Sequence, residues 1–111
     1  MRPIVSFFWE SPTRLTIQEM VLSSIDKGLD AVGEDAKHVL YFYLERKAHI
    51  GREDIVAEPE KFMMVLQNIF GPGSAVLERN IMLHLQEKSQ GRALPNNFPG
   101  AVAALIRHYS Q

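Results

Sequence analysis

The stretch from Glu58 to Lys88 constrains the fold most, because it has the pattern of two helices joined by a glycine turn. Pro59 suits the first position of a helix, where the missing N–H of proline costs no intrahelical hydrogen bond. Apolar residues then recur at i, i+3, i+4, i+7 and i+8, as on one face of a helix. These residues are Phe62, Val65, Leu66, Ile69 and Phe70.

The sequence Gly71-Pro72-Gly73-Ser74 predicts the turn between these two helices. Gly71 and Gly73 end the first helix, and Ser74 is placed to cap the second. The turn lacks the lysine of a phosphate-binding loop and the preceding strand of a nucleophile elbow, so we interpret it as structural. The core stripe of the second helix comprises Leu77, Ile81, Met82 and Leu85.

Before this hairpin, the pattern predicts two further helices. The first begins near Thr16, where Thr16 and Glu19 have the spacing of a capping box, and ends at Gly33. Gly28 interrupts its stripe at a cost of about 1 kcal/mol relative to alanine, which predicts a close contact with another helix. The second helix spans about residues 34–48, with Tyr41 and Phe42 off a core face made of Ala36, Val39, Leu40, Tyr43 and Leu44.

The remaining segments predict a connection and a last helix. Residues 50–57 favour a single helical turn, with Ile55 as an anchor into the core. Residues 89–97 have a loop composition, and a last helix begins near Phe98. The chain is therefore expected to be one all-α domain, a compact bundle of about five helices. Within residues 1–111 we expect an aromatic arm over 1–12, core helices over 13–90, and a loop with the C-terminal helix over 91–111. The arm is either extended or a short helical turn.

Composition limits the classes of protein that the chain can belong to. It has no cysteine, which excludes disulfides, thiolate metal ligands and cysteine catalysis. Twelve basic and thirteen acidic residues nearly cancel, whereas nucleic-acid-binding domains usually carry a basic excess. No apolar run approaches the ~20 residues of a membrane span, and no signal peptide is recognisable, so a cytoplasmic protein is expected.

Part of the chain resembles a known family. The residues that carry the resemblance are Tyr43-Leu44-Glu45, Gly51, Asp54-Ile55, Pro59, Phe62, Leu66, Ile69-Phe70-Gly71 and Ala75. Over roughly residues 28–88, this pattern is similar to a small archaeal helical domain, the Nitrosopumilus-type output domain. The resemblance implies a role downstream of sensory or receiver modules. It implies no catalytic residue, and this chain has no sensor or receiver segment of its own.

Histidine and acidic residues give only weak indications of chemistry. His38 and His49 each follow a glutamate by four residues, which is half of a metal site, but further ligands are not recognisable. His84 lies at the edge of an apolar face and is interpreted as a partly buried histidine. We therefore predict no enzyme, no catalytic residue, no metal and no cofactor.

Apolar residues outside the helix stripes are the main functional signal. They form the candidate interface, which consists of Phe7, Phe8, Trp9, Tyr41, Phe42, Met63 and Met64. Met63 and Met64 cannot both face the core together with Phe62 and Leu66, so at least one should be exposed. The sequence thus predicts a protein-interaction or signalling-output domain that binds a protein partner and self-associates. The alternative is a transcription-associated nucleic-acid binder, for which Arg79, Asn80, Gln86 and Lys88 offer a modest polar helix face.

Overall fold

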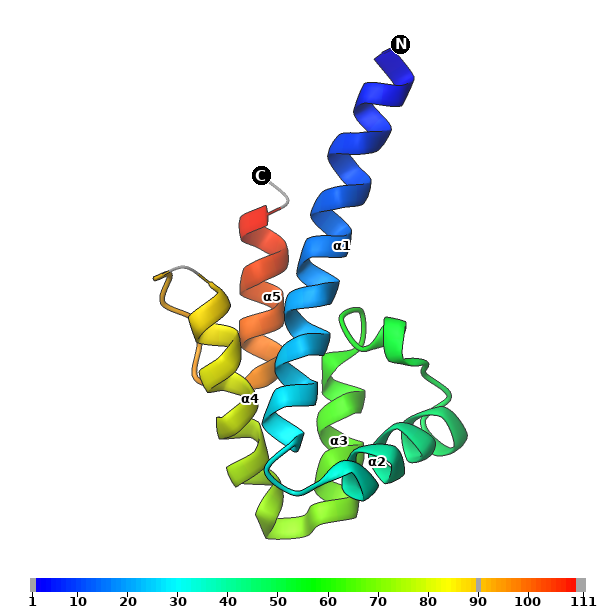
Figure 1. The fold of residues 1–111 in the computed structure, drawn as a ribbon, viewed down its shortest axis with the longest axis vertical. Helices are drawn as coiled ribbons and strands as arrows, with labels where there is room; N and C mark the ends of the chain where they lie inside the picture. Colours follow the sequence, from blue (N-terminus) through cyan, green and yellow to red (C-terminus); the bar gives the residue numbers. More distant parts are fainter. Residues whose placement is uncertain (1, 90, 110–111) are drawn as a thin grey trace.

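Within residues 2–89 and 91–109, which are the residues that the computed structural model describes, the chain forms five α-helices and two 3-10 turns and no strand (Figure 1). Side chains are described for residues 16–89 and 91–108. In chain order the elements are α1 (Arg2–Leu29), α2 (Glu34–Lys47), η1 (Arg52–Asp54), α3 (Pro59–Phe70), η2 (Gly71–Gly73), α4 (Ser74–Lys88) and α5 (Phe98–Tyr109). The predicted all-α class is confirmed.

Helix α1 is much longer than the sequence pattern suggested. It begins at Arg2, so the predicted start at Thr16 is wrong, and so is the extended alternative for the arm. Pro3 lies in the first helical turn, where proline is tolerated, and no glycine interrupts residues 4–10. The N-terminal half of α1 projects beyond the other helices (Figure 1), along the 49 Å long axis of the molecule.

The close helix contact predicted at Gly28 is confirmed, and its partner is α4. A Cβ atom on Gly28 would lie 2.6 Å from Cγ1 of Ile81 and 2.9 Å from its backbone nitrogen. Any larger residue would therefore separate α1 from α4. The glycine costs helix propensity, but it lets the two helices pack at short distance.

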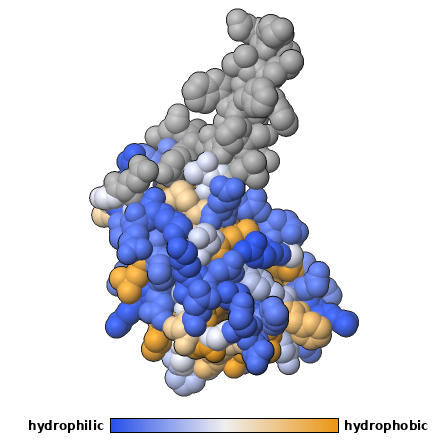
Figure 2. All heavy atoms as spheres, in the orientation of Figure 1, coloured by the Kyte–Doolittle hydropathy of each residue, from blue (hydrophilic) through white to orange (hydrophobic). Residues whose placement is uncertain are grey.

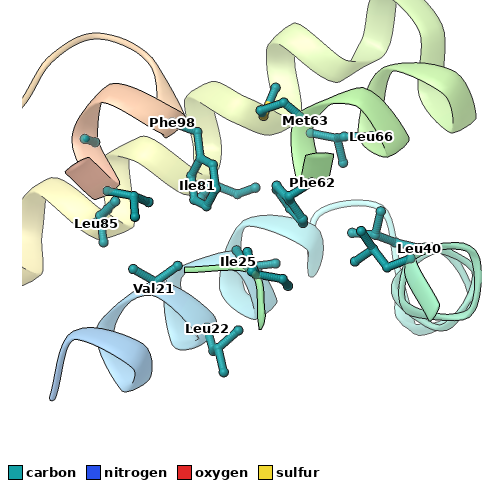
Figure 3. Packing of buried hydrophobic residues seen from close by; sticks show 14 of the residues in the cluster. Val21, Leu22, Ile25, Leu40, Phe62, Met63, Leu66, Ile81, Leu85 and Phe98 are labelled. Atoms are coloured by element: carbon teal, nitrogen blue, oxygen red, sulfur yellow. The ribbon is translucent and has the colours of Figure 1, made fainter. Parts of the chain in front are cut away.

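The core lies between α1 and the α3–α4 hairpin, with α5 closing one side (Figure 3). Phe62 of α3 and Phe98 of α5 are fully buried, with ring centroids 5.0 Å apart. The connection between α2 and α3 contains the predicted helical turn as η1, and its anchor Ile55 is fully buried. Helix α5 begins at Phe98 as expected, and the Asn97 side chain accepts a 2.7 Å hydrogen bond from the N–H of Gly100.

The turn between α3 and α4 is tighter than predicted. Gly71 ends α3 with φ 56°, a conformation that favours glycine. The chain continues through the 3-10 turn directly into α4, whose first residue is Ser74. Ser74 has helical φ −62° and ψ −29°, whereas an N-cap residue has an extended backbone. The predicted capping role of Ser74 is therefore wrong. Ser74 is instead the first residue of α4, and it is buried.

Candidate functional site

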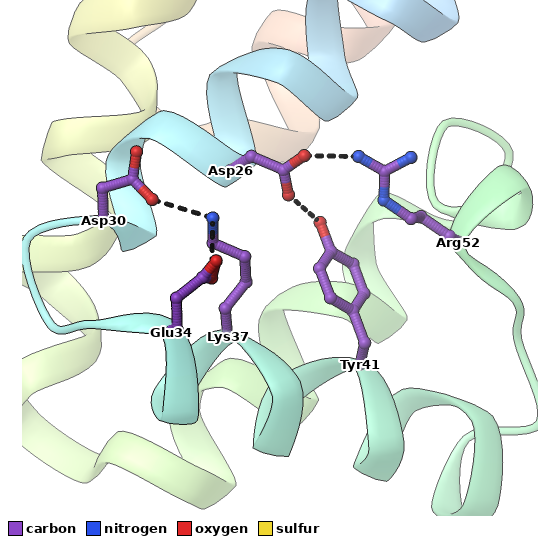
Figure 4. Close-up of polar contacts among 6 residues, drawn as sticks. All are labelled: Asp26, Asp30, Glu34, Lys37, Tyr41 and Arg52. Atoms are coloured by element: carbon purple, nitrogen blue, oxygen red, sulfur yellow. Dashed lines mark hydrogen bonds and ion pairs between the residues drawn. The ribbon is translucent and has the colours of Figure 1, made fainter.

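Helix α2 presents three different faces, and this arrangement defines the candidate site. Leu40 and Leu44 are its buried residues and face the core. Lys37 and Tyr41 form polar contacts, Tyr41 with Asp26 of α1 and Lys37 with Asp30 just after α1 (Figure 4). The third face is exposed and runs the length of the helix.

Two carboxylates hold the polar face of α2: Asp26 belongs to α1, and Asp30 directly follows the end of α1. The Tyr41 hydroxyl donates a 2.7 Å hydrogen bond to Asp26, and the Arg52 guanidinium pairs with the other oxygen of Asp26 (Figure 4). Arg52 also lies over the Tyr41 ring, 5.5 Å from its centroid. One turn away, the Lys37 ammonium donates to Asp30 at 2.8 Å. These contacts fix the rotation of α2 about its own axis.

The contacts in this polar cluster shift the pKa values of three side chains. Burial and the hydrogen bond to Asp26 raise the pKa of Tyr41 above its usual value. Burial alone would lower the pKa of Arg52, but the interactions with Tyr41 and Asp26 outweigh it and leave that pKa raised. The hydrogen bond to Asp30 raises the pKa of Lys37. Each group therefore keeps its proton to higher pH than it would in an unfolded chain.

The exposed face of α2 is formed by four residues, which we call the outer stripe: Asp35, Val39, Phe42 and Arg46. Their spacing of four, three and four residues places them in one row along the helix. Phe42 is 54% exposed and Val39 is 41% exposed, although both are large apolar residues. The Arg46 guanidinium lies over the Phe42 ring at 5.2 Å, so the row is partly organised within the helix itself.

Two residues flank the outer stripe. Tyr43 is exposed and meets the Phe42 ring edge-on, with centroids 6.1 Å apart. His38 is exposed on the other side. The predicted core face of α2 is thus partly wrong, because Val39 and Tyr43 lie outside the core. The hydrogen bond from Tyr41 to Asp26 turns a different side of the helix inward.

The predicted interface residues do not all lie on one accessible surface. Phe42 and Met64 are exposed, whereas Met63 is 8% exposed and belongs to the core. Tyr41 is half-buried and engaged with Asp26. Met63 and Tyr41 are therefore removed from the candidate surface, and the expectation that one of the paired methionines is exposed is confirmed.

The three aromatic residues Phe7, Phe8 and Trp9 belong to α1, but their side chains lie outside the described part of the structure. The residues that the sequence reasoning missed are Val39 and the charged ends of the row, Asp35 and Arg46. The four-three-four spacing in the sequence could have identified them.

The histidines do not converge on a site. His49 follows the end of α2 with φ 57°, so it does not share a helix face with Glu45 as predicted. His84 is partly exposed and lies 3.7 Å from Glu87 on the same helix. Among the described residues, no group of three or more histidines, aspartates or glutamates is arranged to hold a metal ion.

A shallow hollow of about 350 Å³ lies between the loop before α5 and the end of that helix. Its lining includes Arg92, Arg107 and His108 beside the apolar side of Leu105. Of the predicted interface residues whose side chains the structure describes, which are Tyr41, Phe42, Met63 and Met64, none borders it.

The molecular surface shows apolar side chains scattered among polar ones, without a single broad patch on the face in view (Figure 2). In the part of the chain that the structure describes, no helix combines the length and apolarity that a bilayer crossing requires. Comparisons with protein-family models, with curated proteins and with solved structures found no match to this chain.

Proposed function

We propose that this chain is a non-enzymatic interaction domain that self-associates through an exposed helix face, and that the outer stripe of α2 is that face. The observation that carries the proposal is the exposure of Val39 and Phe42 in one row on α2, whose other two sides are already occupied, one by the core and one by polar contacts. The fold leaves about half of each of these two side chains in contact with water, and large apolar side chains on a rigid surface are typical of protein contacts.

The rigidity of α2 supports the same role. Its inner side is fixed by Leu40 and Leu44, and its polar side by the contacts of Tyr41 with Asp26 and of Lys37 with Asp30. A face held in this way loses little conformational freedom on binding, which favours affinity. We also propose an output role of the kind that the family resemblance implies, and the cytoplasm as the location of the protein.

The test compares two exposed apolar residues on different helices. Phe42→Glu places a charge in the outer stripe, and Leu83→Glu places one on α4, where Leu83 is similarly exposed at 60%. Sedimentation velocity of the unmodified chain at tens to hundreds of micromolar is expected to show self-association. Phe42→Glu should weaken it by about tenfold or more, and Leu83→Glu should leave it unchanged.

Two results would contradict the proposal. The first is an unmodified chain that sediments as a 12.6 kDa monomer at all concentrations. The second is an equal effect of the two substitutions, which would mean that α2 has no special part in the contact. Circular dichroism at 222 nm verifies that both variants remain helical.

A further inference from the structure

The charges of the outer stripe suggest how two copies would meet. Asp35 lies in the first turn of α2 and Arg46 in its last turn. Between them are only the apolar members, Val39 and Phe42. Neither Asp35 nor Arg46 has an ion-pair partner among the side chains that the structure describes. The row is thus acidic at one end, apolar in the middle and basic at the other end.

This row is symmetric about a point midway between residues 40 and 41. Rotation by 180° about an axis through that point, perpendicular to the helix, exchanges position 35 with 46 and position 39 with 42. The flanking positions 38 and 43 are exchanged as well. A second copy placed by this rotation runs antiparallel and sets Asp35 against Arg46, and Val39 against Phe42. The same patch is then used by both copies, as a two-fold interface requires.

We propose that two copies of the chain pair antiparallel through α2, with Asp35 of each copy facing Arg46 of the other; this inference rests on the proposed self-association. The charge complementarity decides between the two orientations. A parallel pair would set Asp35 against Asp35 and Arg46 against Arg46, which is repulsive at both ends. The antiparallel pair is attractive at both ends and also aligns the macrodipoles of the two helices favourably.

The size of the contact sets the expected strength. Helix α2 has 14 residues and is therefore about 21 Å long. A single pair of such helices falls at the small end of specific interfaces, which bury roughly 1,200–2,000 Å² in total. The dimer is accordingly expected to be weak and to form at tens to hundreds of micromolar.

A charge-exchange experiment tests the geometry. Asp35→Arg alone sets arginine against arginine at both ends of the pair, and Arg46→Asp alone sets aspartate against aspartate. Each variant should therefore dissociate about tenfold or more readily than the unmodified chain. When the two variants are mixed in equal amounts, the ends become complementary again. The mixture should form a heterodimer with close to the original affinity.

Native mass spectrometry can measure this heterodimer when one variant carries a small mass tag. Lys47→Asp is the matched control for Arg46→Asp, because Lys47 is the next residue, is exposed and lies outside the outer stripe. It carries the same charge change and should leave dimerisation unchanged. The double variant Asp35→Arg with Arg46→Asp should also restore the homodimer.

The outcomes separate this geometry from the broader proposal. If the unmodified chain never dimerises, self-association fails and the antiparallel pairing fails with it. If both single variants dimerise with the same affinity as the unmodified chain, the antiparallel α2 pair is wrong while self-association remains. Loss of dimerisation in both single variants without rescue in the mixture would also overturn the antiparallel arrangement. Recovery in the mixture supports it.

Discussion

Replacement of Gly28 by alanine tests the packing of α1 on α4 most sharply, because two opposing effects can be weighed from the structure. Alanine gains about 1 kcal/mol of helix propensity over glycine. Its Cβ, however, would lie 2.6 Å from Cγ1 of Ile81, 2.9 Å from the backbone nitrogen and 3.0 Å from Cα of the same residue. Rotation of the Ile81 side chain can relieve only the first of these contacts. The other two require α4 itself to move.

The second effect should dominate. Overpacking in a core usually costs about 1–3 kcal/mol, and contact with backbone atoms places this site in the upper part of that range, at about 2–3 kcal/mol. The net result expected for Gly28→Ala is a loss of about 1–2 kcal/mol in the free energy of unfolding. For a domain of this size, that corresponds to a fall in Tm of roughly 4–8 °C.

Gly73→Ala provides the matched control. Gly73 has φ −65° and ψ −16°, and a Cβ there meets no atom within 4 Å. Alanine fits this backbone without strain, so it should stabilise the protein by about 0.4–1 kcal/mol through the unfolded state. Urea denaturation followed by circular dichroism at 222 nm measures both variants. Equal stabilisation by the two substitutions would refute the close contact between α1 and α4.

Three further outcomes follow from the structure. Met63→Ala should lower the free energy of unfolding by about 2–5 kcal/mol, because Met63 is a core residue. Met64→Ala, at the adjacent exposed position, should change it by less than about 0.5 kcal/mol, and urea denaturation measures both variants. Because the pKa of Tyr41 is raised, its stabilising contribution is fully present below about pH 10, the usual tyrosine pKa, and is lost as the pH rises further. Absorbance at 295 nm should show one tyrosine that ionises at a higher pH than usual, and this ionisation should disappear in Tyr41→Phe. Ser24→Ala should stabilise the protein by about 1 kcal/mol, because the Ser24 hydroxyl is buried without a hydrogen-bond partner among the described residues. Thermal denaturation measures this change, and a lower Tm for the variant would contradict the expectation.

The helical hairpin was predictable because each of its signals is local. Pro59 starts α3, one complete stripe covers its inner face, and Gly71 ends it with a positive φ. The need for glycine at position 28 was also predictable, since an unfavourable residue in a helix interior requires a compensating contact. Only the structure identified Ile81 as the residue that makes this contact.

The rotation of α2 was not predictable, because apolar residues lie on almost every side of that helix. The choice depends on Asp26, which is fifteen residues before Tyr41 and accepts its hydrogen bond. A contact over this distance leaves no periodic signal in the sequence. For the same reason, the sequence indicated that at least one of the two adjacent methionines is exposed but did not distinguish Met63 from Met64.

The start of α1 was misplaced because a local signal was misleading. Thr16 and Glu19 have capping-box spacing, and Pro12 precedes them, so the pattern favours a helix that begins near Thr16. In the structure the helix continues through all three positions.

A distance between two copies of α2 tests the central claim most directly. The chain contains no cysteine, so a single Lys47→Cys variant accepts one nitroxide label at a defined place outside the outer stripe. In the antiparallel pair, position 47 lies level with position 34 of the other copy. The two labels are then offset by about 20 Å along the helix axis. Double electron–electron resonance at 200 micromolar should give a distance of about 20–30 Å. The absence of dipolar coupling at that concentration, or a distance below about 15 Å, would contradict the antiparallel pairing of α2.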